Sequence, residues 1–431
     1  MKNLTLLLAV FVLCIISCKK DPVVNNNEPK ITRFTFTKAA NPTLKEDVEG
    51  TISGNEITVT LHSVEKTALK ANITTDATTL DYHGELKDFT QPVTISLQNG
   101  AGKQMVYTVK ATFRDVYFTS YEYNQTRSIA VYWKNGNKVI LTDPSNLNLA
   151  ESGSAIYVTG NDIYVAGASK NIDENLVTAV YWKNGVKTEL TTGETNTHSE
   201  AIARAIKVVG SDVYVIGSIF YPGNSKYGLN VYFTVYWKNG VVTKLTDGSL
   251  NSNVTSLAIH NNDIYVSGFV QNPSMNAYYR AVYWKNGNKV ELSNGTTDAV
   301  ARAIAVVNND VHLVGIEDGN AVHWKNGVKQ VLGRGNGYAI QVEGNDVHIG
   351  GSNEFFAATY WKNGNKIKTF SIRGFNLSVF EKDVYMFGFT AAQGTQKFIF
   401  YLNDQQKPIE IINIDHIEGE DNPHAVFIKN Q

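Results

Sequence analysis

Arginine is the residue type whose placement in this sequence most suggests binding chemistry. After Arg114, the arginines fall in or beside the long connections between predicted strands: Arg127, Arg204, Arg280, Arg302, Arg334 and Arg373. A guanidinium group can hold a carboxylate or sulfate through two parallel hydrogen bonds. These residues therefore predict a site for an anionic ligand. The structural alternative is that they pair with loop acids such as Glu200, Asp298, Glu317 and Glu354.

A repeated motif indicates the scaffold that must position these arginines. Every tryptophan precedes Lys-Asn-Gly, at Trp133, Trp182, Trp237, Trp284, Trp324 and Trp361. Asn-Gly is a strong signal for a tight β-hairpin, and intervals of 37 to 55 residues are typical of propeller blades. Strands that start with Asp run in step with this motif, at positions 115, 162, 212, 263, 310, 346 and 383. The sequence thus predicts an all-β fold with a seven-bladed β-propeller over residues 114–431.

The two ends of the predicted propeller complement each other. The first blade lacks its first strand, whereas the chain ends with an unassigned strand-like segment from Ala425 to Ile428. Pairing this segment with residues 115–120 would close the ring and leave no exposed sheet edge there. A seven-repeat solenoid is the alternative, but it would leave both half-blades unmatched.

The loops of such a ring differ between its two faces. The turns between the first and second strands of a blade, and between the third and fourth, are short and uniform, whereas the other connections are long and variable. Because binding residues in a scaffold concentrate on variable loops, we expect the ligand on the long-loop face. The residues just before each first strand should ring the channel there: Ser154, Arg204, Leu257, Arg302, Tyr338, Asn376 and His424. Aromatic residues of the same face, including Phe355 and Phe356, could stack on sugar rings.

We interpret the repeated tryptophans, aspartates and histidines as structural features. The tryptophans share one context, which indicates packing between blades rather than a sugar platform. The repeated aspartates should accept hydrogen bonds from turn N–H groups. His312, His323 and His348 replace the tyrosine expected at their repeat positions. Three imidazoles could form a metal site, but inter-sheet packing is the favoured interpretation. We predict neither a metal nor a cofactor, and we find no nucleophile-elbow, zincin or phosphate-loop motif.

The N-terminus predicts export. Lys2 precedes an apolar run from Leu4 to Ile16 that is too short to span a membrane. The segment ending in Ser17-Cys18 resembles the lipobox of bacterial lipoproteins, and Lys19-Lys20-Asp21 resembles the charged segment that follows the lipidated cysteine in surface-displayed lipoproteins of the Bacteroidota. This resemblance implies a signal peptide over 1–17, acyl chains such as palmitate on Cys18, and an outer-membrane location facing the cell surface or periplasm. Residues 18–29 are a polar tether, and residues 30–113 resemble the Ig-like modules that follow such anchors.

Composition narrows the functional classes. The chain has 431 residues, 18% of them charged, and a formal net charge of −1, so nucleic-acid binding is not expected. We expect a membrane-anchored protein that binds an anionic glycan or a protein ligand, with the Ig-like module as a spacer. The alternatives are an enzyme that acts on a polysaccharide or lactone, and a structural partner in an outer-membrane complex.

Overall fold

The computed structural model consists of β-strands and turns, with no helix in its described part. This confirms the predicted all-β class. The predicted signal peptide, Cys18 and the tether as far as residue 26 lie outside the described residues. Within those residues, no helix has the length and apolar character needed to cross a membrane. The structure describes residues 27–44, 46–62, 68–123, 126–193, 200–223, 230–273, 275–380, 383–392, 395–402, 409–415 and 425–430.

The N-terminal module has two sheets around one apolar core. One sheet has the order β2-β1-β6, and in the other β10 pairs with both β4 and β9. The rings of Phe34, Phe36 and Phe89 pack edge to face in the core, with centroids 4.9–6.4 Å apart. The strands are β1 (Ile31–Phe36), β2 (Val48–Glu49), β3 (Thr51–Ser53), β4 (Glu56–His62), β5 (Ala68–Leu69), β6 (Ala71–Thr75), β7 (Thr79–Leu80), β8 (Lys87–Asp88), β9 (Val93–Gln98) and β10 (Gln104–Tyr123).

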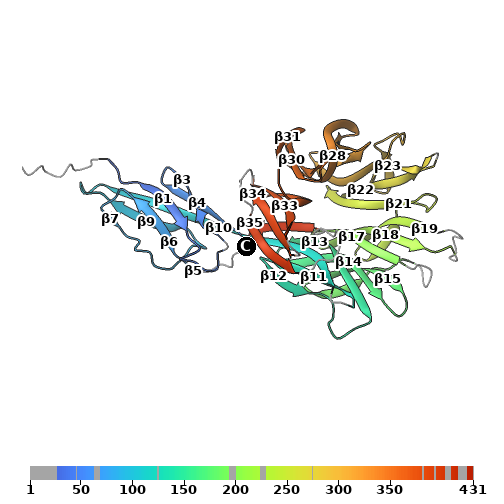
Figure 1. Cartoon of the computed structure of the whole chain (residues 1–431), viewed down its shortest axis with the longest axis horizontal. Coiled ribbons are helices and arrows are strands. Elements are labelled where there is room, and N and C mark those ends of the chain that lie inside the picture. The colour runs from blue at the N-terminus through green and yellow to red at the C-terminus, as the bar shows by residue number, and fades with distance from the viewer. Residues whose placement is uncertain are drawn as a thin grey trace, which may run out of the picture.

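Strand β10 joins this module to the rest of the chain without interruption (Figure 1). Its first half pairs with β9 and, in parallel, with β4. Its second half pairs with β11 and with the C-terminal strand β36. The domain boundary placed between residues 113 and 114 therefore lies inside one continuous strand.

The remaining strands form successive four-stranded antiparallel units. The first unit combines β36 (Ala425–Asn430), β10, β11 (Ser128–Lys134) and β12 (Asn137–Ile140). The next three are β13 (Leu149–Thr159), β14 (Asp162–Asn171), β15 (Leu176–Lys183) and β16 (Val186–Glu189); β17 (Glu200–Val209), β18 (Asp212–Tyr221), β19 (Val231–Lys238) and β20 (Val241–Lys244); and β21 (Ser252–His260), β22 (Asp263–Asn272), β23 (Met275–Lys285) and β24 (Asn288–Glu291).

Two further units share one long strand. They are formed by β25 (Ala299–Val307), β26 (Asp310–Glu317), β27 (Asn320–Lys325), β28 (Val328–Glu343), β29 (Asp346–Asn353), β30 (Ala358–Lys362) and β31 (Asn365–Thr369). The first part of β28 closes one unit, and its second part opens the next. The last unit comprises β32 (Arg373–Phe380), β33 (Asp383–Ala392), β34 (Thr395–Leu402) and β35 (Ile409–Asp415).

The units are arranged as a ring, which is the arrangement of a β-propeller (Figure 1). Their first strands contact one another in a closed cycle, in the order β36, β13, β17, β21, β25, β28, β32 and back to β36. Strand β36 enters this cycle by pairing with β10, from Arg114 opposite Asn430 to Thr119 opposite Ala425. We call these first strands the inner strands.

The Lys-Asn-Gly motif ties the second strand of a unit to its third. The Asn184 amide oxygen accepts the Ile163 N–H at 2.8 Å, while its amide nitrogen donates to Asp162 at 2.7 Å. Lys183 lies 2.8 Å from the other oxygen of that carboxylate. Hydrogen bonds from Lys183 and Asn184 hold the pKa of Asp162 below its usual range. The carboxylate partners are therefore these side chains, and not the turn N–H groups that the sequence suggested.

The tryptophans fill the space between neighbouring units. All six side chains are at most 3% exposed. The Trp237 indole N–H donates to the Thr191 carbonyl oxygen of the preceding unit at 2.6 Å. The predicted packing role is thus confirmed. Replacing such a buried ring by alanine typically costs about 3–5 kcal/mol.

Candidate functional site

Most inner strands carry a β-bulge at the position that the sequence analysis assigned to the channel mouth. In β17, Ala203 pairs with Gly217 and Ala205 with Ile216, which leaves Arg204 as the extra residue. In β25, Ala301 pairs with Gly315 and Ala303 with Val314, which leaves Arg302. A bulge redirects side chains locally. It therefore determines where both guanidinium groups point.

In five of the units, the glycine five residues after the initial Asp makes the bulge possible. A Cβ atom at Gly217 would collide with the carbonyl oxygen of Ile202, and one at Gly315 with that of Val300. Only a residue without a side chain allows the bulged backbone to approach this closely. The repeated Asp-to-Gly spacing thus has a direct structural purpose in positioning the bulge residues.

The bulge also shifts the phase of the inner strand. Ala201 and Ala203 before the bulge, and Ile206 and Val208 after it, pack into the same apolar core. In a regular strand, residues of odd and even number would face opposite sides. Because the extra residue absorbs one position, Arg204 and the residue three positions later both lie off this core.

Arg204 and Arg302 are partly buried site residues without a polar partner among the described residues. Neither makes a hydrogen bond or ion pair with the residues that the structure describes, and the Nε atom of each is buried. The Arg302 guanidinium lies over the Tyr338 ring of the next inner strand, 5.1 Å from its centroid. Burial lowers the pKa of Arg204 from its usual value, with Glu200 and Tyr232 opposing this shift. The Arg204 guanidinium nevertheless stays charged at neutral pH.

A cavity of about 490 Å³ lies between the inner strands, beyond the level of the arginines. It is nearer the short turns than the long loops, since its wall includes Val209, Val307 and Phe380 at the ends of inner strands. Its volume is in the range of small-ligand sites. Three positions after successive bulge residues, the wall contains Tyr157, Lys207, Ala258, Ala305 and Gln341.

Lys207 is a site residue that the sequence analysis missed. It lines the cavity, and its Nζ atom lies 5.2 Å from the centroid of the Tyr157 ring. Tyr157 in turn contacts Phe427 edge to face. Burial lowers the pKa of Lys207 from its usual value. The Lys207 amine has no hydrogen-bond or ion-pair partner among the described residues.

Two other predicted site arginines are occupied by their own surroundings. Arg127 is 3% exposed and donates to the carbonyl oxygens of Asn146 and, at 2.8 Å, of Leu149. Arg280 forms an ion pair with Glu291 at 3.0 Å and donates to the Asn272 amide oxygen at 3.2 Å. These contacts give both arginines a structural role in holding loops and strands together. The partner of Arg280 is a strand residue, unlike the loop acids considered from the sequence.

The remaining predicted site residues lie at bulges, at other strand positions, or outside the described residues. Ser154 and Tyr338 occupy the bulges of β13 and β28. In β21 the bulge residue is Thr255, so Leu257 does not take the bulge position; it lies two residues further along the strand, is 4% exposed and lines the central cavity. Asn376 follows an irregularity in β32. The Arg373 side chain and all of His424 lie outside the described residues, whereas Arg334 is exposed.

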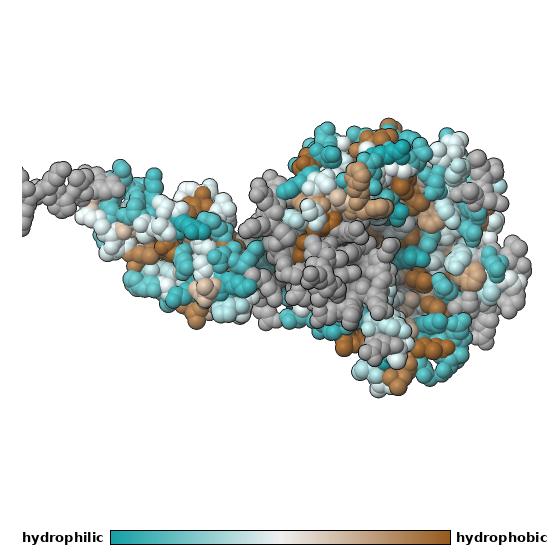
Figure 2. Space-filling model, viewed as in Figure 1, coloured by the Kyte–Doolittle hydropathy of each residue, from teal (hydrophilic) through white to brown (hydrophobic). Residues whose placement is uncertain are grey.

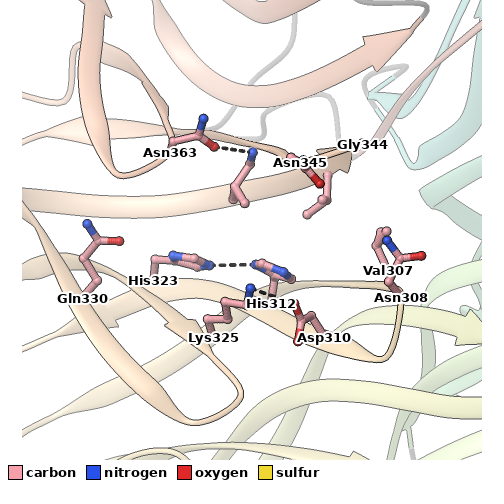
Figure 3. Close-up of a pocket in the computed structure, with 12 residues that line it drawn as sticks. Val307, Asn308, Asp310, His312, His323, Lys325, Gln330, Gly344, Asn345 and Asn363 are labelled. Atoms are coloured by element: carbon pink, nitrogen blue, oxygen red, sulfur yellow. Dashed lines mark hydrogen bonds and ion pairs between the residues drawn. The ribbon is translucent and has the colours of Figure 1, made fainter.

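A second cavity, of about 390 Å³, lies where two histidines replace tyrosines (Figure 3). His312 Nδ1 and His323 Nε2 are 3.1 Å apart, and the two rings are nearly parallel. Burial lowers the pKa of His312, and it lowers the pKa of His323 to about 4, with His312 contributing. His348 bonds instead to the Tyr360 hydroxyl at 2.8 Å. The three imidazoles considered as a metal site therefore do not converge.

Comparison with known proteins gives only distant similarities. No protein-family model and no curated protein matches the chain. Pyrococcus horikoshii acylaminoacyl peptidase is similar at 12% identity and a TM-score of 0.42, over 69% of this chain and 50% of that one. Trypanosoma rangeli sialidase in complex with sialic acid is 7% identical, with a TM-score of 0.34, over 57% and 53%. Aleuria aurantia lectin in complex with alpha-methyl-L-fucoside is 11% identical, with a TM-score of 0.33, over 66% and 95%.

The chain thus spans about half the length of the peptidase and sialidase chains. At TM-scores below 0.5, these similarities assign no ligand or reaction to it.

Proposed function

We propose that this chain is a lipid-anchored binding protein that takes an anionic glycan at the mouth of its central channel. In this proposal the four-stranded units are the blades of a seven-bladed propeller, and the N-terminal module is an Ig-like spacer. The closed cycle of inner strands supports the propeller. The Ser17-Cys18 sequence supports a lipid anchor on Cys18. Palmitate labelling of the wild type, and the loss of that label in Cys18→Ser, would test the anchor.

The pair Arg204 and Arg302 carries the binding proposal. A partly buried charge without a partner loses hydration and gains no compensating contact. Both arginines incur this cost at equivalent bulges, two units apart in the ring. A carboxylate or sulfate would supply the missing acceptors, and Lys207 adds a third cation deeper in the channel. An anion that reaches this level therefore gains several charge-assisted hydrogen bonds.

A glycan array probed with the full chain tests the proposal. We expect the wild type to bind acidic glycans, and the double variant Arg204→Ala/Arg302→Ala to lose that binding. Arg33→Ala is the matched control, because Arg33 is an exposed arginine of the module that pairs with Glu49. Unchanged array binding by the double variant would refute the channel-mouth site. Release of shortened glycans would instead favour the enzyme alternative, whose chemistry requires two carboxylates about 5–9.5 Å apart.

A further inference from the structure

Two adjacent phenylalanines are displayed in the loop between β29 and β30. Phe355 is 79% exposed and Phe356 is 63% exposed. Many other exposed apolar residues are single valines on outer strands, such as Val186 and Val241. Figure 2 shows the corresponding pattern on the visible face, where hydrophobic residues are scattered among hydrophilic ones. A neighbouring pair of exposed rings is a different feature, of the kind that marks an interaction site.

The loop holds these rings in a fixed and strained conformation. The Asn353 amide oxygen accepts the N–H groups of Phe355 and Ala357, both at 3.0 Å. The Asn353 carbonyl oxygen accepts the Phe356 N–H at 3.1 Å. Phe356 has a φ of 61°, a left-handed conformation that a bulky residue adopts at a free-energy cost. Glycine would fit this position without strain, so folding alone does not explain a phenylalanine there.

An exposed arginine, Arg334, lies on β28 near the base of the loop, with its Nη1 atom against Gly319 in the turn between β26 and β27. Gly335 pairs with Asn353, so Arg334 is the next residue outward on β28, and Glu354 is the first residue of the loop after β29. Gly333 and Gly335 have φ values of 129° and 130°, which favour glycine. They allow β28 to pass from one unit to the next with Arg334 between them. Arg334 makes no hydrogen bond or ion pair with any described residue, including Glu354.

The same strand connects this surface with the channel mouth. Tyr338 follows Arg334 by four residues on β28 and carries Arg302 against its ring. Four strand residues span about 13 Å. Arg334 therefore lies about 13 Å along β28 from the Tyr338–Arg302 contact, and neither guanidinium has a hydrogen-bond or ion-pair partner among the described residues. A ligand that contacts both ends must be longer than one sugar ring and must carry acidic groups.

We infer that Phe355, Phe356 and Arg334 form an outer subsite for an acidic oligosaccharide that extends from the channel mouth. A phenylalanine ring packs against the apolar face of a sugar, and Arg334 pairs with a carboxylate or sulfate on the same or the next unit. This inference rests on the proposed function, because the inner end of the same ligand binds Arg302 and Arg204. It adds the ligand class: a carboxylated or sulfated oligosaccharide rather than a small anion.

Calorimetric titration of the full chain carrying Cys18→Ser tests the subsite. The probes are oligogalacturonate, its methyl ester, heparin oligosaccharide and citrate. We expect Phe355→Ala and Phe356→Gly each to weaken binding of at least one acidic oligosaccharide fivefold or more, with citrate binding unchanged. Arg334→Gln should weaken binding of that acidic probe. If the probe is oligogalacturonate, the methyl ester should be insensitive to this change. Leu86→Ala, at an exposed apolar residue of the module, is the control.

A stability measurement separates binding from a structural role. Phe356→Gly removes the strained conformation, so its free energy of unfolding should equal or exceed that of the wild type while oligosaccharide binding falls. If oligosaccharide binding requires Arg204 and Arg302 but is unaffected by the phenylalanine variants, the subsite is refuted and the proposed function stands. If neither oligosaccharide binds, both proposals fail. If the phenylalanine variants lose only binding to phosphatidylcholine–phosphatidylglycerol vesicles, the loop contacts a bilayer and the inference is overturned.

Discussion

The Nε2 atom of His62, at the end of the N-terminal module, lies 2.8 Å from the phenol oxygen of Tyr385 in the last unit of the ring. Arg114 donates to the same phenol and lies 2.5 Å from a carboxylate oxygen of Asp383. Strand β10 carries Arg114 through this contact on its way into the ring. The module is therefore joined to the ring by a side-chain network as well as by a continuous strand.

This junction predicts a stability loss in acid. Burial lowers the pKa of His62 to about 4, with Arg114 adding to the shift and Asp383 opposing it. An unfolded histidine has a pKa near 6.5. Because the folded pKa is the lower one, the contribution of neutral His62 is complete above pH 6.5 and is lost as the pH falls towards 4. The difference corresponds to roughly 3 kcal/mol.

Chemical denaturation at pH 7 and pH 4 would measure this loss. We expect the wild type to lose roughly 3 kcal/mol more than His62→Gln, which does not titrate in this range. Subtracting the variant removes the contributions of the other histidines. Equal losses for the two proteins would show that His62 is not buried as a neutral group.

The close approach at the bulge predicts that Gly217→Ala is damaging. Its Cβ would meet the carbonyl oxygen of Ile202, so either the bulge or the strand must move. We expect the free energy of unfolding to fall by about 1–3 kcal/mol, and anion binding to fall because Arg204 is displaced. Gly100→Ala is the control, since the nearest atom to its added Cβ is 3.7 Å away. Thermal unfolding and titration of both variants would test this, and equal effects would contradict it.

Lys207→Met should stabilise the protein and weaken ligand binding. The amine lies in a cavity wall without a described anionic partner, and burial lowers its pKa. Replacing it with an apolar side chain of similar length removes the cost of burying a charge. A gain of about 1 kcal/mol or more in the free energy of unfolding is expected. Loss of stability without any change in acidic-glycan affinity would assign Lys207 a packing role instead.

The repeated turn motif should matter more in the first unit than in the second. Asp115 and Asn135 are 4% and 6% exposed, whereas the Asp162 side chain is 40% exposed. Burial raises the pKa of Asp115, but hydrogen bonds from Asn135, Lys134 and Tyr117 outweigh it, so the pKa is lowered overall. Asn135→Ala leaves a buried carboxylate short of a partner and should cost about 2–3 kcal/mol. Asn184→Ala should cost about 1 kcal/mol, and urea titrations would rank the two.

The sequence predicts the scaffold better than the site, because the repeated motifs indicate where each strand and turn begins. Asn-Gly turns and Asp-initiated strands occur in each complete copy, so the strand order follows from them. The bulge was harder to place: it makes Arg204 and Lys207 lie on one side although they are three residues apart. Strict alternation therefore concealed Lys207. Leu257 was expected at the position equivalent to Arg204, but the extra residue in β21 is Thr255, and Leu257 lies two residues further along the strand.

Ring closure by β36 has a consequence for how the protein is made. The inner strand of the first unit, β36, is synthesised some 300 residues after β10, the strand with which it pairs. Until those residues emerge, the partner edge of β10 stays open to other chains. A chain that folds from its N-terminus as it is made would thus have an open ring, and the edge of β10 would need protection from aggregation, until β36 has been made.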